Sequence, residues 1–161
     1  MDKLYNCNLK MNTKEVAKLI IDAKIDDKLQ TEEPTSLVEE ISSLEVQKAG
    51  NKRRTKIGLV FASKYCHFHQ PNRFVIYDRF ASYALDNLIG RKSKGYNQFK
   101  SGIDKLVSAA SLSLTYKEVD QYLWLYGQLL FHMDGKDGSP SSEIKDVMIR
   151  GKDLFSKLNP Q

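Results

Sequence analysis

Cysteine is scarce in this sequence of 161 residues, which contains only Cys7 and Cys66. Small secreted domains that cannot build a large core usually carry many more cysteines, paired as disulfides. The polar N-terminus also has neither the apolar segment nor the cleavage pattern of a secretory signal peptide. We therefore expect a cytoplasmic protein whose thiols stay reduced.

Long apolar runs are missing as well. The most apolar stretch, Tyr122–Phe131, is interrupted by Gly127 and Gln128, and it is shorter than the roughly 18 to 20 apolar residues that a membrane-spanning helix needs. The sequence therefore predicts no membrane span. A chain of this length can bury about two thirds of its unfolded surface, so we predict a single domain over residues 1–161, with 1–11 as a short lead-in.

Acidic residues are rare in the middle of the chain. Between Val46 and Ile103, twelve lysines and arginines stand against Asp78 and Asp86, so this segment carries +10 and the rest of the chain −5, for a total of +5. Such asymmetry favours a polyanionic partner, and DNA is the partner that we expect. A solvated basic face without a ligand is the alternative. The predicted DNA-backbone contacts are Lys52, Arg53, Arg54, Lys56, Arg73, Arg79, Arg91, Lys92 and Lys94.

The densest basic cluster, Lys52–Lys56, comes directly before a new apolar run. A helix N-terminus disfavours cations because of the helix dipole. The cluster also has no acidic neighbours in the sequence. We therefore interpret it as a phosphate-binding cluster at the start of a helix.

Apolar residues recur at spacings of three and four residues over most of the chain, as one face of a helix requires. This pattern predicts an all-α fold in one compact domain of about seven helices. The expected helices cover residues 13–25, 36–50, 55–70, 79–90, 99–110, 116–131 and 142–158.

Local signals place several of these helix ends. Asp78 stands where an N-cap is expected, Gly90 supplies a C-terminal stop, and Thr115 with Glu118 has capping-box spacing. The apolar segment Phe74–Tyr77 is too short to argue a sheet, so we predict a buried extended connector. The helix over 116–131 is apolar nearly all round, which predicts the central core helix.

The segment Ala62–Asp78 gathers a lysine, two histidines, a cysteine, four aromatic residues and a terminal aspartate. It resembles helix-hairpin-helix DNA glycosylases of the 8-oxoguanine type, in which one helix carries a catalytic lysine and a proline loop leads to an aspartate that opens the next helix. Lys64, Pro71 and Asp78 match these positions. Val60 and Ala62 replace the glycines of the family's hairpin, which implies a shortened or absent hairpin.

The resemblance implies a monomeric DNA-repair enzyme that flips a damaged or modified base and hydrolyses its N-glycosidic bond without a cofactor. Asp78 would stabilise the oxocarbenium-like sugar or activate water. Lys64 would be its electrostatic partner or a nucleophile that forms a Schiff base with AP-lyase chemistry, which needs an amine whose pKa is lowered by burial or positive neighbours. If Asp78 is only a cap and Lys64 only a surface lysine, the protein is a non-catalytic nucleic-acid-binding module.

Aromatic side chains usually form the walls around a flipped base. The candidates for this base pocket are Tyr65, His67, Phe68, His69, Phe74, Tyr77 and Trp124. Aromatic residues at helical spacing are more often part of the core, and Trp124 in the most apolar helix fits that reading best. Cys66 with the two histidines could suggest zinc, but neighbouring helix positions point to different faces and no fourth ligand is evident, so we predict no metal site.

Overall fold

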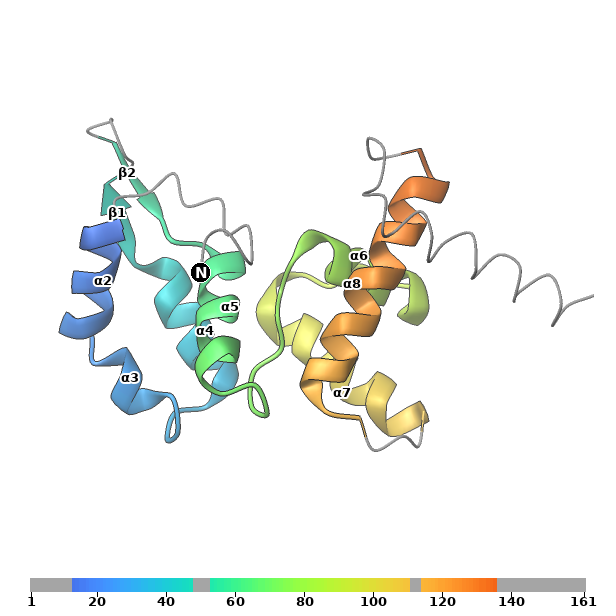
Figure 1. The fold of residues 1–161 in the computed structure, drawn as a ribbon, viewed down its shortest axis with the longest axis horizontal. Helices are drawn as coiled ribbons and strands as arrows, with labels where there is room; N and C mark the ends of the chain where they lie inside the picture. The colour runs from blue at the N-terminus through green and yellow to red at the C-terminus, as the bar shows by residue number, and fades with distance from the viewer. Residues whose placement is uncertain (1–12, 48–52, 111–113, 136–161) are drawn as a thin grey trace, which may run out of the picture.

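The computed structural model of the chain describes residues 13–47, 53–110 and 114–135. Helices make up most of it (Figure 1), which confirms the all-α class. The described helices are α2 (Thr13–Asp22), α3 (Ile25–Lys28), α4 (Pro34–Ser43), α5 (Leu59–His69), α6 (Arg79–Ile89), α7 (Gly95–Ala110) and α8 (Tyr116–Met133). The expected lead-in over 1–11, Lys52 and the expected helix over 142–158 lie outside the described residues. Within the described ranges, no helix combines the length and apolarity needed to cross a membrane.

The helices lie in two groups (Figure 1). Helices α2 to α5 form the N-terminal group, and α6 to α8 form the C-terminal group, in which α8 packs along α6. Residues 70–78 link them. One cluster of buried side chains runs through both groups, including Leu37 and Ile41 of α4 and Phe99 and Ile103 of α7. Whether the two groups form one domain over residues 1–161 stays a prediction.

The first predicted helix, 13–25, is two helices. Helix α2 ends at Asp22, and Lys24 adopts the left-handed conformation with φ 51° and ψ 41°. This conformation is uncommon for a residue with a Cβ atom. It redirects the chain so that Ile25, which is fully buried, begins α3 on a new axis.

The second predicted helix, 36–50, was also wrong at both ends. Glu33 caps α4 by accepting a hydrogen bond from the Ser36 N–H at 2.8 Å, and the helix ends at Ser43. The chain then forms a small antiparallel sheet of β1 (Glu45–Gln47) and β2 (Arg54–Lys56), in which Val46 faces Thr55. Strands of three residues are too short for periodicity to reveal them.

This hairpin changes the position of the basic cluster. Helix α5 begins only at Leu59, after Gly58 at φ 85°, instead of at residue 55. Arg54 and Lys56 therefore lie on an exposed strand, not in the first turn of a helix. The argument that a helix dipole makes these cations unfavourable was wrong.

The caps of the C-terminal group follow the sequence signals. Asp78 caps α6 by accepting from the Ala81 N–H at 2.9 Å, and Gly90 ends this helix at φ 68°. Thr115 and Glu118 form the predicted capping box of α8. Helix α7 begins at Gly95 instead of Phe99, because its first turn includes Tyr96, which is fully buried.

Helix α8 is not the fully buried core helix that was predicted. It buries Val119, Leu123 and Gly127, whereas Tyr122 is 53% exposed and Trp124 40% exposed. A Cβ atom at Gly127 would lie 2.1 Å from the carbonyl oxygen of Phe80. Glycine is therefore needed for the close approach of α8 to α6.

Candidate functional site

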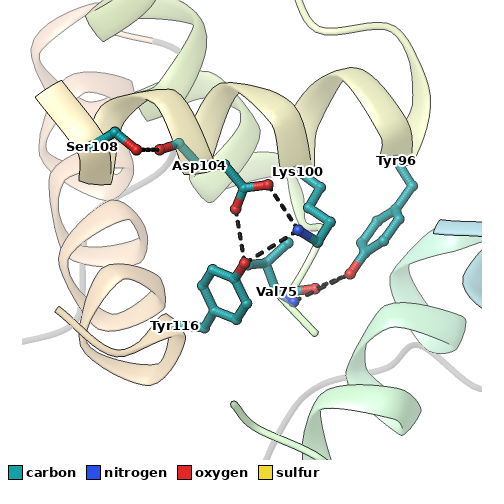
Figure 2. Close-up of polar contacts among 6 residues, drawn as sticks. All are labelled: Val75, Tyr96, Lys100, Asp104, Ser108 and Tyr116. Atoms are coloured by element: carbon teal, nitrogen blue, oxygen red, sulfur yellow. Dashed lines mark hydrogen bonds and ion pairs between the residues drawn. The ribbon is translucent and has the colours of Figure 1, made fainter. Parts of the chain in front are cut away.

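The predicted connector Phe74–Tyr77 lies outside any helix or strand, and Phe74, Val75 and Ile76 are buried as predicted. Buried backbone groups need hydrogen-bond partners. Here side chains of the flanking helices supply them. The hydroxyl of Tyr96 accepts from the Val75 N–H at 3.2 Å and donates to the Val75 carbonyl at 3.1 Å (Figure 2).

His67 of α5 supplies another of these partners. Its Nδ1 lies 2.7 Å from the carbonyl oxygen of Phe74. Because a carbonyl only accepts, Nδ1 carries the proton. Burial lowers the pKa of His67, with the positive Lys117 acting in the same direction and the hydrogen bond to Phe74 opposing them. The imidazole ring therefore stays neutral and donates its hydrogen bond to the connector.

Ser63 makes the contact that matters most for the predicted site. Its fully buried hydroxyl accepts from the Tyr77 N–H at 2.9 Å and lies 3.4 Å from the Tyr77 carbonyl oxygen. Ser63 directly precedes Lys64, and Tyr77 directly precedes Asp78. This hydrogen bond therefore fixes the backbone of the predicted lysine beside that of the predicted aspartate.

A third ionisable group, Asp120 of α8, joins these two. Burial, and after it the negative charge of Asp78, raise the pKa of Asp120 to about 7, against the opposing positive charge of Lys64. The Oδ1 atom of Asp120 is buried and has no hydrogen-bond partner. Lys64, Asp78 and Asp120 thus lie close enough for their charges to interact, and we call them the Lys64 cluster.

The sequence reasoning missed Asp120 because it treated α8 as apolar all round. A usable signal was present. Asp120 precedes Leu123 by three residues and Gly127 by seven, so it lies on the buried face of the helix. An acid on such a face is a candidate for a perturbed pKa and a functional role.

A polar network holds the start of α8 in place (Figure 2). Lys100 donates to Asp104 at 2.8 Å and to the Tyr116 hydroxyl at 3.2 Å, and that hydroxyl donates to the other Asp104 oxygen at 2.8 Å. Burial lowers the pKa of Lys100, but these hydrogen bonds outweigh it and leave the pKa raised. Lys100 therefore stays charged and anchors α8 to α7, one turn before Asp120.

The seven predicted base-pocket residues do not form one wall. Phe74 is fully buried in the core, which leaves its ring no exposed surface for a base. Tyr77 packs edge-on against Phe99, with ring centroids 5.1 Å apart. His67 is held by the connector. These three belong to the interior of the fold.

The other four candidates are more accessible. Tyr65 donates a hydrogen bond to Asp26 and packs on His69, with ring centroids 4.7 Å apart. Phe68 is 56% exposed and lies edge-on to His69. Trp124 is exposed on α8, one turn after Asp120, so it is not the core residue that its helix suggested.

A zinc site at Cys66 and the two histidines, which the sequence did not favour, does not fit these positions. Cys66 is fully buried and its burial raises the thiol pKa to about 12, which disfavours the thiolate that would bind a metal. Nδ1 of His67 is engaged by the Phe74 carbonyl, and His69 is exposed and packs at a tilt against Tyr65. Among the described residues, no group of three or more potential ligands is placed to hold a metal ion.

Arg73 and Arg54, both predicted DNA-backbone contacts, donate hydrogen bonds to backbone carbonyl groups. Arg73 donates to the carbonyl of Leu29 and, at 2.9 Å, to that of Glu32, which ties the loop after α5 to the turn before α4. Arg54 donates to the Glu45 carbonyl at 3.0 Å and lies 3.6 Å from the Glu15 carboxylate. Arg54 thus has an acidic partner in the fold, although Glu15 lies far from the cluster in the sequence.

The remaining described basic residues of this set lie at the surface. Arg79 places its guanidinium 4.5 Å from the ring centre of Phe80 and 5.4 Å from that of Phe131, so its position is partly fixed. The exposed members are Arg53, Lys56, Arg79, Arg91, Lys92 and Lys94. They come from the hairpin, the start of α6 and the loop between α6 and α7.

Comparison with known proteins gives limited matches. Residues 1–73 match the family HI_0787_N, described as an N-terminal domain. An uncharacterized protein of Haemophilus influenzae (strain Rd) is 32% identical over 122 residues, which cover 72% of this chain and 57% of that protein. The chain thus spans little more than half the length of that relative. No solved structure matches significantly. The family match ends at Arg73, so it includes Lys64 but neither Asp78 nor Asp120.

Proposed function

We propose that the protein is a DNA N-glycosylase of the helix-hairpin-helix type that removes a flipped, damaged or modified base. It would act as a monomer in the cytoplasm. The single observation that supports this function best is the Lys64 cluster: an amine and two carboxyl groups from three elements of the fold whose charges interact. Two carboxyl groups in different environments are the usual requirement for glycosidic bond hydrolysis.

Asp78 is the carboxylate that works at the sugar. At the N-terminus of α6 it accepts from the Ala81 N–H, and both this bond and the helix dipole favour a negative charge there. A carboxylate next to the sugar stabilises the oxocarbenium-like transition state or takes a proton from the attacking water.

Lys64 is the amine of the site. The hydrogen bond between Ser63 and Tyr77 holds its backbone beside that of Asp78. In this position its amine either stabilises negative charge on the departing base or attacks the sugar carbon and forms a Schiff base. The second chemistry would add strand cleavage to base release.

DNA would be held by the exposed cations and the base by exposed aromatic rings. Lys56 on the hairpin and Arg91, Lys92 and Lys94 in one loop offer phosphate contacts that need no sequence readout. Trp124 and Phe68 keep exposed ring surface for stacking on an unpaired base.

The test is a panel of duplexes that each carry one modified base, assayed for abasic sites. We expect base release from at least one duplex, and Asp78→Asn should slow it by about 10²- to 10⁴-fold. Asp22→Asn, which changes an exposed aspartate at the end of α2, is the matched control and should keep full activity. Borohydride should trap a covalent DNA adduct only if Lys64 is the nucleophile. Such an adduct should be absent in Lys64→Gln and present in Lys105→Gln.

The second candidate function is a non-catalytic module that binds nucleic acid, which the exposed cations alone would support. Salt-dependent DNA binding without base release across the panel, unchanged in Asp78→Asn, would establish this function and reject the glycosylase. Absence of any salt-dependent DNA binding would reject both.

A further inference from the structure

The carboxyl group of Asp120 has no evident structural role in the fold. Its Oδ1 is buried without a hydrogen-bond partner, although the helix that bears it is capped and firmly packed. Burying an unpaired carboxylate oxygen is costly, so the neutral acid is the favoured form in such a place. A neutral carboxyl group beside a reacting centre is a proton donor.

We propose that Asp120 is the general acid of the reaction and gives its proton to the departing base. This inference rests on the proposed function and deepens it, because it assigns the second carboxyl group a role opposite to that of Asp78.

The surroundings of the two carboxyl groups support opposite roles. Asp78 lies at a helix N-terminus and accepts a backbone N–H, an environment suited to a negative charge. Asp120 follows the buried Val119 and shares its face with the buried Leu123. The charged groups that act on it are Asp78 at the start of α6 and Lys64 of α5.

The acidity of Asp120 fits this division. Burial and the negative Asp78 together raise its pKa to about 7, against the opposing charge of Lys64. A general acid works best when its pKa lies near the operating pH, because it is then protonated often and still donates readily. A carboxyl group whose pKa is raised by its surroundings in this way is suited to act as the acid of a site.

The proton and electron balance of the step is complete within the site. The electron pair of the N-glycosidic bond moves to the base, and the Asp120 proton joins the base, which leaves as a neutral molecule. A water oxygen bonds to the sugar carbon and gives its proton to Asp78. Asp120 ends as a carboxylate and Asp78 as an acid, and exchange with solvent restores both.

The packing of α8 holds Asp120 in this position. The Lys100, Asp104 and Tyr116 network fixes the first turn of α8, and Gly127 lets the helix lie against the backbone of Phe80. Asp120 lies between these two anchors. A fixed donor is required, because proton transfer needs a heavy-atom distance of about 3 Å.

The experiment measures single-turnover base release against pH for the full-length wild type, Asp120→Asn and the control Asp22→Asn. On a neutral substrate base, Asp120→Asn should be about 100-fold slower near pH 6. The wild-type rate should fall above about pH 7, and this alkaline fall should be absent in Asp120→Asn. Asp120→Glu, which keeps an acid, should recover part of the rate.

The charge of the leaving base distinguishes proton donation from a structural role. A quaternised, N-methylated form of the same base leaves as a neutral molecule without a proton, so Asp120→Asn should slow its release little. Equal slowing on both bases, or an unchanged alkaline fall in Asp120→Asn, would overturn the role of Asp120 while leaving the glycosylase activity standing. A wild type that releases no base from any duplex would overturn both.

Discussion

The two helix groups contribute different chemistry to the Lys64 cluster. The N-terminal group, α2 to α5, supplies the amine of Lys64, whereas the C-terminal group, α6 to α8, supplies both carboxyl groups. The family match over 1–73 covers the first group and stops just before the connector Phe74–Tyr77. Neither group holds the complete cluster, so any function of this cluster depends on how the connector joins the two.

The groups also differ in how they are held together. In the N-terminal group, backbone pairing and surface polar contacts dominate around the hairpin, where the Glu15 carboxylate accepts from the Gln47 N–H at 2.9 Å. The C-terminal group is held together by the close approach of Gly127 in α8 to α6 and by the hydrogen bonds of the half-buried Lys100. Changes in the C-terminal group should therefore disturb the two carboxyl groups most directly.

The largest expected effect is that of Gly127→Ala. Its Cβ would lie 2.1 Å from the Phe80 carbonyl oxygen, a backbone atom that cannot move aside alone. We expect a loss of about 3 kcal/mol in the free energy of unfolding, measured by urea denaturation. Gly102→Ala is the control: its Cβ would meet the flexible side chains of Leu85 at 3.0 Å and Ile89 at 3.4 Å, which can shift slightly, so it should cost much less. Equal effects of the two would show that α8 does not depend on this close approach.

The next effect is a gain in stability for Asp120→Asn at alkaline pH. The folded pKa of Asp120 is about 7 against an ordinary 3.8, so the folded state keeps a proton that the unfolded state has lost. The stability that protonated Asp120 contributes to the folded state is therefore fully present below about pH 4. It is lost as the pH rises to about 7.

Removing that charge should stabilise the protein by roughly 2 kcal/mol at pH 8 and by little at pH 4. Denaturation curves at the two pH values measure this, with Asp22→Asn as the reference. A variant that is less stable than wild type at pH 8 would show that the buried carboxylate is favourably paired.

Tyr96→Phe tests the connector from the side of the C-terminal group. It removes the hydroxyl that serves both the N–H and the carbonyl of the buried Val75. Two buried backbone groups without a partner should cost about 2 kcal/mol, measured by thermal unfolding. Tyr122→Phe, at an exposed position of α8, should change little. If Tyr96→Phe is equally mild, water replaces the hydroxyl and the connector does not need it.

Ser63→Ala tests the same connector from the side of the N-terminal group and should have the smallest effect on stability, about 1 kcal/mol. Because Ser63 holds Tyr77 beside Lys64, base release should fall more than DNA binding does. Ser43→Ala removes a similar hydroxyl contact at an exposed site and is the control. A parallel loss of binding and base release in Ser63→Ala would indicate general loosening of the fold instead.

The sequence predicted the features that depend on a few neighbouring residues. Asp78 as a cap, Gly90 as a stop and the Thr115–Glu118 capping box are set by local hydrogen bonds and backbone conformation, so short motifs reveal them. The extended connector was also predictable, because Pro71 ends α5 and an apolar segment follows.

The features that were missed depend on distant residues. The hairpin is bound to Glu15, which lies 32 residues before Gln47. Arg73 was interpreted as a DNA contact, yet its partners are carbonyl groups more than 40 residues earlier. Asp120 became a site residue only when the packing of α8 against α6 placed its charge within reach of Asp78 and Lys64. The spacing of residues along one helix does not show which residues of other elements lie near it.

The central claim is that the two helix groups bring Lys64, Asp78 and Asp120 into one electrostatic unit. It is tested most directly by NMR titration of the Asp120 carboxyl carbon in wild type, Asp78→Asn and Lys64→Met. We predict a wild-type pKa of about 7 for Asp120, a lower pKa in Asp78→Asn and a higher pKa in Lys64→Met. A pKa of Asp120 that neither substitution changes would contradict this claim, because the charges of the three groups would then not interact.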